Sequence, residues 1–372
     1  MKSTSRFRSQ MLILFCFFLL SCSTDEKNSI NNEESVETKD DENPEDVPES
    51  LGLKDINPSQ LIGGTIAPLL DNTKYMNIHA KEFNAGQVLW YAGFGGWPAE
   101  GSFNYDNFNL VVNWMDDNNI SSHNHMLVGP DFYMPEWLTS KTWTNEELDS
   151  HLKNLVQGIM DSNDNKTKVD VWNIINEVFN QDGTYRSEND MLWTQLGYEG
   201  DTSGLSAEDK INNQHPVFIR KAFSYAREKT DKTLEYRDYL IEATNPANGW
   251  DKKHKAVYQL LRHLQNSDIP IDAIGIQGHY DIGNTDWVLE NNGLEKVIQK
   301  FKALGLEVYI TELDIGSQDM LWTDALAEQQ KEDYYNAVKQ SVEGGASRIY
   351  TWGIQDGLDK GWRTNEHPLP WD

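Results

Sequence analysis

The stretch "VDVWNIINEVFN" (169–180) combines an almost wholly apolar run with a carboxylate near its end. The apolar residues extend to Ile175, and Asn176 and Glu177 follow directly. A short apolar run of this kind is typical of a strand that is covered on both faces of a parallel sheet. Glu177 is therefore predicted to stand at the end of a buried strand, where a carboxylate needs a chemical role or a charged partner.

Seven further segments have the same short and mostly apolar character: 61–67, 82–90, 121–129, 233–240, 271–277, 306–311 and 347–354. Apolar residues at helical spacing precede several of them, such as Leu148, Leu152, Leu155 and Ile159 before 169–175, and Tyr335, Val338 and Val342 before 347–354. Eight strands separated mostly by helices predict the α/β class and favour a (β/α)₈ TIM barrel over a doubly wound sheet. No glycine-rich dinucleotide or phosphate-binding motif follows any of these strands.

Chemistry in such a barrel occurs at the carboxyl ends of the strands. The polar or aromatic residues expected there are His125, Asn176, Glu177, Asp238, Gln277, His279, Glu312, Asp314, Trp352 and Asp356. Glu177 and Glu312 follow the fourth and seventh strands, and two carboxylates that face each other across a cleft are what glycoside hydrolysis requires. Either residue alone could be a salt-bridge partner at the barrel rim, but the pair favours catalysis.

Several motifs resemble glycoside hydrolase family 10, the endo-β-1,4-xylanase family. "VDVWNIINEVFN" resembles its acid/base motif, and "GLEVYITELDI" (305–315) resembles its nucleophile motif. "PIDAIGIQGHY" (270–280), "YTWGIQD" (350–356), "LEYRDY" (234–239) and "HMLV" (125–128) follow in the family's order. The resemblance covers residues 61 to 372. "HPLPWD" (367–372) is similar to a late segment that a last helix normally follows, so the chain is expected to be truncated or to lack that helix.

The resemblance implies a role for each matching residue. Glu177 would be the general acid/base and Glu312 the nucleophile of a double displacement with net retention, with carboxyl groups about 5–5.5 Å apart. The supporting residues would be Asn176 on the sugar 2-hydroxyl, His279 and Asp314 around Glu312, and Gln277 nearby. The substrate-binding residues would be His125, Trp90, Trp352 and Trp362. Glu177 is expected to be protonated at rest and Glu312 to be ionised.

The chain departs from the family's pattern mainly on one side of the predicted site. Ala85, Gly86 and Leu89 stand where the family has a Glu-Asn pair and a Lys after its second strand, and Gly129 and Pro130 replace a Trp and a His after the third. Arg237 stands where the family has Asn on the fifth strand. In the family these positions bind sugars on the non-reducing side of the cut. We therefore expect a decorated xylan or another β-linked glycan in place of plain xylan. "YAGFGGWP" (91–98) could supply a new wall or be a surface loop.

The N-terminal sequence is that of an export signal followed by a tether. A basic start precedes the apolar run "MLILFCFFLL" (11–20), which is too short to span a bilayer as a helix. "LLSCS" resembles a bacterial lipobox, in which Cys22 would carry lipid; the alternative is an ordinary secretory signal. Residues 25–50 contain 11 acidic and 2 basic residues and few large apolar ones, which indicates disorder. The expected organisation is a signal peptide over 1–21, an acidic tether over 22–56 and a catalytic domain over 57–372.

The net charge of −27 argues against a nucleic-acid partner, because binding to phosphates depends on Lys and Arg. We expect a monomer that takes a neutral polysaccharide, that contacts a membrane only through the N-terminal lipid, and that belongs to the cell envelope as an outer-membrane lipoprotein, facing the surface or the periplasm. No cofactor or metal is expected. "HNH" (123–125) could seed a metal site, because His123 and His125 would share one face of a strand, but it stands alone.

The leading hypothesis is a retaining endo-β-1,4-xylanase-like hydrolase that cleaves xylan or a related or decorated β-linked polysaccharide. The alternative is a catalytically weak or inactive glycan-binding lipoprotein on the same barrel. The altered sugar contacts favour the alternative. The joint presence of Glu177 and Glu312 favours the hydrolase, because binding alone requires neither an acid nor a nucleophile.

Overall fold

The computed structural model describes residues 51–66, 72–200, 203–204, 214–246, 249, 251–318, 321–356, 363 and 365–370. Eight parallel strands pair in the order β11-β1-β2-β3-β4-β7-β8-β10, and β10 pairs with β11 to close a barrel. These strands are β1 (Leu61–Ile66), β2 (Ala85–Leu89), β3 (Ser121–His125), β4 (Val171–Asn176), β7 (Thr233–Asp238), β8 (Ala273–Ile276), β10 (Glu307–Gly316) and β11 (Arg348–Thr351). Each lies within or overlaps one of the eight predicted segments, so the predicted (β/α)₈ barrel is confirmed.

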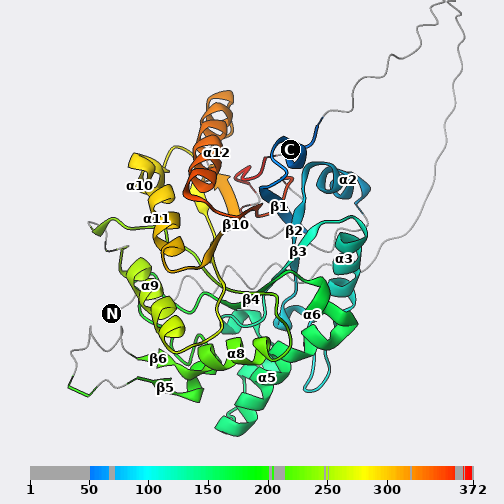
Figure 1. Ribbon diagram of the computed structural model, residues 1–372, viewed down its shortest axis with the longest axis vertical. Coiled ribbons are helices and arrows are strands. Elements are labelled where there is room, and N and C mark those ends of the chain that lie inside the picture. The colour runs from blue at the N-terminus through cyan, green and yellow to red at the C-terminus, as the bar shows by residue number, and fades with distance from the viewer. Residues whose placement is uncertain are drawn as a thin grey trace, which may run out of the picture. The chain divides into compact units, whose positions relative to one another are not determined.

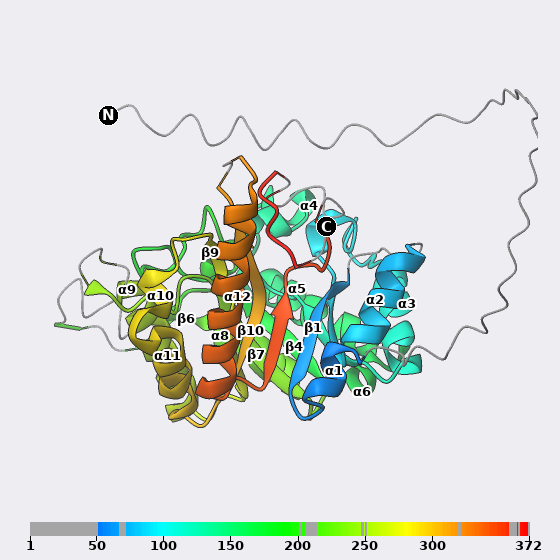
Figure 2. The same cartoon turned by 90° about the horizontal axis from the view of Figure 1, so that it is seen from above.

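Helices surround the strands, as Figure 1 shows, and the strand arrows run in one common direction in Figure 2. The longer helices are α2 (Thr73–Glu82), α3 (Asp106–Asp117), α5 (Asn145–Asp161), α8 (Val217–Arg227), α9 (Asp251–Asn266), α11 (Gly293–Lys302) and α12 (Asp324–Gly344). Short helices are α1 (Leu53–Ile56), α4 (Glu136–Thr139), α6 (Asn165–Lys168) and α10 (Asp286–Leu289). In the described part of the chain, no helix is both long enough and apolar enough to cross a membrane.

Helix α5 shows how local sequence sets these elements. Thr144 caps its first turn by accepting a hydrogen bond from the Glu147 amide, and the Glu147 carboxylate accepts one in return from the Thr144 amide. This reciprocal arrangement satisfies two amides that would otherwise lack partners. The predicted stripe from Leu148 to Ile159 is fully buried against the barrel.

Helix α12 lies where a helix is predicted, but only Val338 of its predicted apolar stripe packs against the core. Tyr335 is 60% exposed and Val342 is 40% exposed. The buried face is instead formed by small and polar residues, among them Ala337, Ser341 and Asp333. The Asp333 carboxylate accepts a hydrogen bond from the Gly283 amide at 2.8 Å, so this face is held partly by polar contacts that apolar periodicity does not report.

The domain begins before the predicted boundary at residue 57. Helix α1 lies inside the range predicted as tether, and the Leu53 amide donates to the Glu82 carboxylate at the end of α2. Gly52 also packs tightly there, since a Cβ at this position would lie 2.1 Å from the Lys81 carbonyl oxygen. The predicted signal peptide, Cys22 and the tether up to residue 50 lie outside the described residues.

Shorter elements line the carboxyl ends of the strands. Two 3₁₀ helices, η1 (Ala92–Phe94) and η2 (Asp131–Tyr133), follow β2 and β3, and η4 (Leu192–Leu196) lies beyond β4. A small antiparallel pair is formed by β5 (Tyr198–Glu199) and β6 (His215–Pro216), and β9 (His279–Asp281) pairs with the end of β10. These elements, and not the barrel itself, shape the surface around the site.

Candidate active site

Glu177 follows β4 directly and is held at a sharp change of chain direction. Its φ angle of +56° lies in the left-handed region, which is unusual for a residue with a side chain and recurs at functional sites. Its amide donates to the Arg237 carbonyl at 3.0 Å, and its carbonyl accepts from Arg186 Nε at 2.7 Å. Its carboxylate accepts a hydrogen bond from Gln277 Nε2 at 2.9 Å, with Arg186 Nη2 at 3.4 Å.

Glu312 lies on β10, and a cationic cluster surrounds its carboxylate. Arg237 Nη1 donates to Oε1 at 3.1 Å, and His279 Nε2 donates to Oε2 at 3.2 Å. His279 is oriented in turn by Asp314, 2.8 Å from its Nδ1. Burial opposes a charge on His279, but Asp314 and Glu312 raise its pKa to about 10, so it is an imidazolium at neutral pH. Glu312 therefore lies between two groups that are positively charged at neutral pH, Arg237 and His279.

The pKa values of the two glutamates are shifted in opposite directions. Burial raises the pKa of Glu177, and the nearby charges of Asp238 and Glu312 raise it further. Burial also opposes ionisation of Glu312, but the hydrogen bond from His279 and the charge of Arg237 outweigh it and lower the pKa to about 2. The raised pKa favours the protonated form of Glu177 and the lowered pKa favours the anion of Glu312, the pairing that marks an acid/base and nucleophile couple. Their predicted separation of about 5–5.5 Å stays a prediction.

Arg237 stands at a position that binds sugar in the family, but here it lies inside the barrel with no exposed surface. Its guanidinium contacts Glu312, Glu235 and the two histidines of "HNH". The Glu235 carboxylate, also fully buried, lies 3.1 Å from Arg237 Nη2 and 2.6 Å from His123 Nε2. The arginine that replaces the family's Asn at this position therefore contacts the predicted nucleophile Glu312 and does not line the substrate pocket.

Replacing Arg237 with Ala is expected to lower the free energy of unfolding by about 3–5 kcal/mol, because Glu235 would be left as an uncompensated buried charge. Removal of the guanidinium also raises the pKa of Glu312, so the acid limb of kcat/KM shifts to higher pH. Chemical denaturation and pH–rate profiles measure the two effects. The double variant Glu235→Gln/Arg237→Gln is expected to regain stability while keeping the shifted acid limb.

Arg220→Ala is the matched control for this variant. Arg220 pairs with Glu199 at 2.8 Å, but both side chains are partly exposed, and such surface pairs contribute about 0–1 kcal/mol. Equal destabilisation by Arg220→Ala and Arg237→Ala would contradict the special role given to the buried pair, as would an unshifted acid limb.

Asn176 and Gln277 join the two halves of the site. Gln277 Nε2 lies 3.3 Å from Asn176 Oδ1, while the Gln277 carbonyl accepts from the Glu312 amide at 2.8 Å. Asn176 Nδ2 is buried and has no hydrogen-bond partner among the described residues. Because buried polar groups are nearly always satisfied, an unused donor beside Glu177 fits a group that binds a ligand hydroxyl.

His125 and Trp352 lie beside the glutamates, as predicted. The Trp352 ring meets His125 edge to face at 5.3 Å and His279 at 6.3 Å, so it walls the cleft next to Glu312. Burial and the charge of Arg237 lower the pKa of His125 to about 3. Its Nδ1 lies 2.9 Å from Arg237 Nη1 and 3.0 Å from Asn173 Oδ1, so the ring is held between an arginine and an amide.

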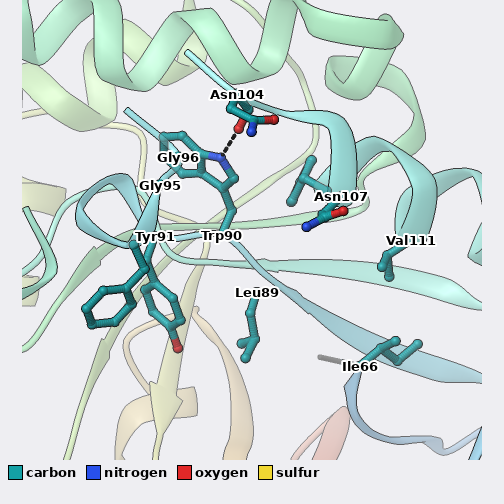
Figure 3. A pocket seen from close by; sticks show the side chains of 11 residues that line it. Ile66, Leu89, Trp90, Tyr91, Gly95, Gly96, Asn104, Asn107 and Val111 are labelled. Atoms are coloured by element: carbon teal, nitrogen blue, oxygen red, sulfur yellow. Dashed lines mark hydrogen bonds between the residues drawn. The ribbon is translucent and has the colours of Figure 1, made fainter. Parts of the chain in front are cut away.

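Trp90 is placed differently from the other predicted wall residues. It is 5% exposed, and its indole N–H donates to the Asn104 carbonyl at 2.9 Å. Figure 3 shows its ring directed toward Asn104, on the opposite side of the chain from Tyr91. It lines a cavity of about 280 Å³ together with Leu89 and Asn107. Its ring therefore serves this cavity and the packing around it, and Trp362 lies outside the described residues.

The other departures from the family's pattern separate in space. Ala85 and Gly86 do not follow β2 as expected; they begin it, where Ala85 pairs with Ser121 at the start of β3. They therefore lie at the end of the strand away from the glutamates and cannot form a sugar pocket. Leu89 does lie at the carboxyl end, opposite His125 in the register, and Gly129 with Pro130 leads into η2.

Besides Arg186 and Arg237, sequence reasoning missed three further residues around the glutamates. Arg363 Nη1 donates to Asp314 Oδ1 at 2.9 Å and so orders the carboxylate that positions His279. Lys253, almost fully buried, pairs with Asp238 at 2.6 Å. Burial raises the pKa of Tyr133, and the charges of Glu177 and Glu312 raise it further, which places this phenol near both carboxylates. These residues come from loops and from helix α9, where periodicity carries no functional signal; only the uncommon charge of Lys253 on a buried helix face hints at a role.

The histidines of "HNH" share one face of β3, as predicted, but their ring nitrogens are engaged by Glu235, Arg237 and Asn173. Burial lowers the pKa of His123 to about 4, so both rings are neutral at pH 7. Across the described ranges, no group of three or more His, Cys, Asp or Glu side chains has the arrangement of a metal site.

Comparisons with known proteins agree with this geometry. The model of glycosyl hydrolase family 10 matches residues 66–372. The chain is 29% identical over 304 residues to endo-1,4-beta-xylanase B of Thermotoga neapolitana, covering 79% of this chain and 76% of that protein. It is 27% identical over 274 residues to endo-1,4-beta-xylanase A of Thermoanaerobacterium saccharolyticum, covering 70% of this chain and 21% of that protein. Xylanase 10B from Thermotoga petrophila in complex with xylobiose is 26% identical, with a TM-score of 0.68 over 86% of this chain and 91% of the other.

Proposed function

This chain belongs to glycosyl hydrolase family 10, and on that premise we propose that it is a retaining endo-β-1,4-xylanase-like enzyme whose preferred substrate is a substituted xylan. The observation that carries the proposal is the opposite electrostatic setting of Glu177 and Glu312. A protein that only binds glycans has no need of an acid with a raised pKa beside an anion with a lowered one.

The first step of the reaction uses both glutamates. A Glu312 carboxylate oxygen attacks the anomeric carbon, the bond to the leaving oxygen breaks, and Glu177 transfers its proton to that oxygen. In the second step Glu177, now a carboxylate, takes a proton from water, whose oxygen attacks the same carbon and releases Glu312. Two displacements restore the original configuration. Asn176 Nδ2 is the donor available for a sugar hydroxyl beside the bond that is cut.

The preference for substituted chains is supported by the apolar character of one side of the site. Leu89, Gly129 and Pro130 cannot donate side-chain hydrogen bonds to sugar hydroxyls, so a hydroxyl that carries a substituent loses no protein partner there. A xylan chain with free hydroxyls gains no hydrogen bonds from these side chains either. Selectivity is therefore expected to shift toward decorated chains.

Release of reducing ends from a panel of substituted and unsubstituted xylans and other β-glycans tests the proposal. We expect turnover of xylans, with the β-anomer as the first product seen by proton NMR, and higher kcat/KM for the substituted preparations. An unsubstituted xylan that is cleaved best would contradict the proposed preference. Binding without turnover of any glycan would favour the glycan-binding alternative.

We also propose that the enzyme is held in the cell envelope through lipid on Cys22. The support is the N-terminal sequence alone: a short apolar run, the lipobox-like "LLSCS" and an acidic segment that would hold the barrel away from a membrane surface.

A further inference from the structure

Four aromatic residues gather beside the active site and form what we call the aromatic platform: Tyr91, Phe94, Phe132 and Tyr133. Phe94 is 58% exposed and Phe132 is 51% exposed, and no other described phenylalanine is among the exposed large apolar residues. Both rings pack on Tyr133, at centroid distances of 6.1 and 4.1 Å. A cluster of exposed aromatic rings of this kind is typical of a surface that binds a ligand or a partner molecule.

The aromatic platform is built on two short helices in close contact. A Cβ added to Gly93 in η1 would lie 2.7 Å from the Met134 carbonyl oxygen and 2.8 Å from that of Tyr133, so the two backbones touch. Tyr91 and Tyr133 stack at 5.1 Å with planes 14° apart. The Leu192 amide donates to Asp131 Oδ1 at 2.7 Å and fixes the start of η2. The rings are therefore held in place before any ligand arrives.

This surface is continuous with the catalytic centre. The Tyr91 ring meets His125 edge to face at 5.7 Å, and His125 accepts from the arginine that holds Glu312. The segment that carries Tyr133 also lies beside the strand that leads to Glu177. Val128, five residues before Tyr133, forms a parallel bridge with Ile175, which is two residues before Glu177. A polysaccharide that places one bond between the glutamates would extend over these rings.

We propose that the aromatic platform is a sugar subsite that stacks pyranose rings of a substituted xylan-type chain, recognising their apolar faces and not their hydroxyl groups. The inference rests on the proposed function and deepens it. The exposed rings of Phe94 and Phe132 offer neither donors nor acceptors, so acetyl or glycosyl groups on a stacked sugar leave no protein group unpaired. Two neutral rings also suit a neutral polymer better than a charged partner.

The test combines the double variant Phe94→Ala/Phe132→Ala with Tyr335→Ala, which removes an aromatic ring that is 60% exposed on helix α12. Native affinity electrophoresis measures binding to acetylated xylan and to the same preparation after deacetylation, and kcat/KM is measured on both and on a short aryl xyloside. The wild type is expected to bind both xylans with similar affinity. The double variant is expected to lose affinity for both by about ten-fold, as removal of two stacking faces predicts. Tyr335→Ala is expected to keep the wild-type affinity for both xylans and the wild-type activity on the aryl xyloside.

The binding measurement tests the subsite, and the turnover measurement tests the proposed hydrolase function, so the two can fail separately. If the double variant binds and cleaves both xylans as the wild type and Tyr335→Ala do, the subsite is wrong while the hydrolase stands. If the wild type binds xylan and loses this affinity in the double variant but turns over no xylan, the subsite stands and the proposed hydrolase function is wrong.

Discussion

Replacing Glu312 with Ala is expected to reduce kcat/KM on xylan by a factor on the order of 10⁵ or more, because no other carboxylate can form the covalent intermediate. The loss follows from the position of this side chain, which is 4% exposed and is held as an anion by His279 and Arg237. Azide can enter the space left by the carboxylate. With an activated aryl xyloside it would attack from the side that Glu312 occupied and give the α-glycosyl azide, which NMR identifies.

Glu307→Ala is the matched control for this experiment. Glu307 lies at the other end of the same strand, is exposed, and pairs only with Ser347 in the described contacts. Its replacement removes the same atoms from β10 without touching the site, so activity is expected to stay within two-fold of the wild type, as for most surface substitutions. Substantial residual activity in Glu312→Ala, with no azide product, would refute the assignment of the nucleophile.

Predictions from the sequence succeeded where the residues of one short segment are enough to predict its structure. Strand β4 is apolar except for Asn173 and ends at Asn176, so the place of Glu177 follows from the strand itself. Glu312 follows the apolar run 306–311 in the same way, although β10 continues past it to Gly316. Both glutamates are predictable because a short apolar run is a local sign of a buried parallel strand, and such strands carry the site toward their carboxyl ends.

The role of Arg237 was not predicted, because comparison by motif says which residue is replaced and not where its side chain points. Alternation along β7 places Glu235 and Arg237 on one face, so an acid and a base two residues apart on a buried strand were a readable sign of an internal ion pair. Its contact with Glu312 joins strands that are 75 residues apart in sequence, which no local pattern reports. The aromatic platform was equally hidden, since η1 and η2 meet only once the barrel has brought β2 beside β3.

The electrostatic design of the site explains why a buried arginine is tolerated next to the nucleophile. Arg237 carries one positive charge and is shared between two buried carboxylates, Glu235 and Glu312. Glu235 offsets the guanidinium charge in the absence of substrate. When Glu312 becomes an ester in the covalent intermediate and loses its charge, Arg237 still has Glu235 as its partner, so the buried cation is never left uncompensated.

Replacing Glu177 with Ala is expected to affect substrates according to their leaving groups. On xylan, where a poor leaving oxygen needs a proton, kcat/KM is expected to fall by about 10²–10⁴-fold. On an aryl xyloside with an acidic phenol as leaving group, formation of the covalent intermediate needs no proton and changes little. Steady-state kinetics on the two substrates measure the difference, and Glu188→Ala, an exposed acid on the same loop, is the matched control.

Product stereochemistry and pH dependence complete the test of Glu177. Because Glu312 is still present, azide attacks the covalent intermediate and gives the β-glycosyl azide, the opposite anomer from that expected for Glu312→Ala. Burial raises the pKa of Glu177, and activity of the wild type is lost as pH rises through that value because the acid loses its proton. This alkaline limb is expected to vanish in Glu177→Ala on the aryl substrate. An equal loss of activity on both substrates, or an alkaline limb that persists unchanged, would show that another group is the acid.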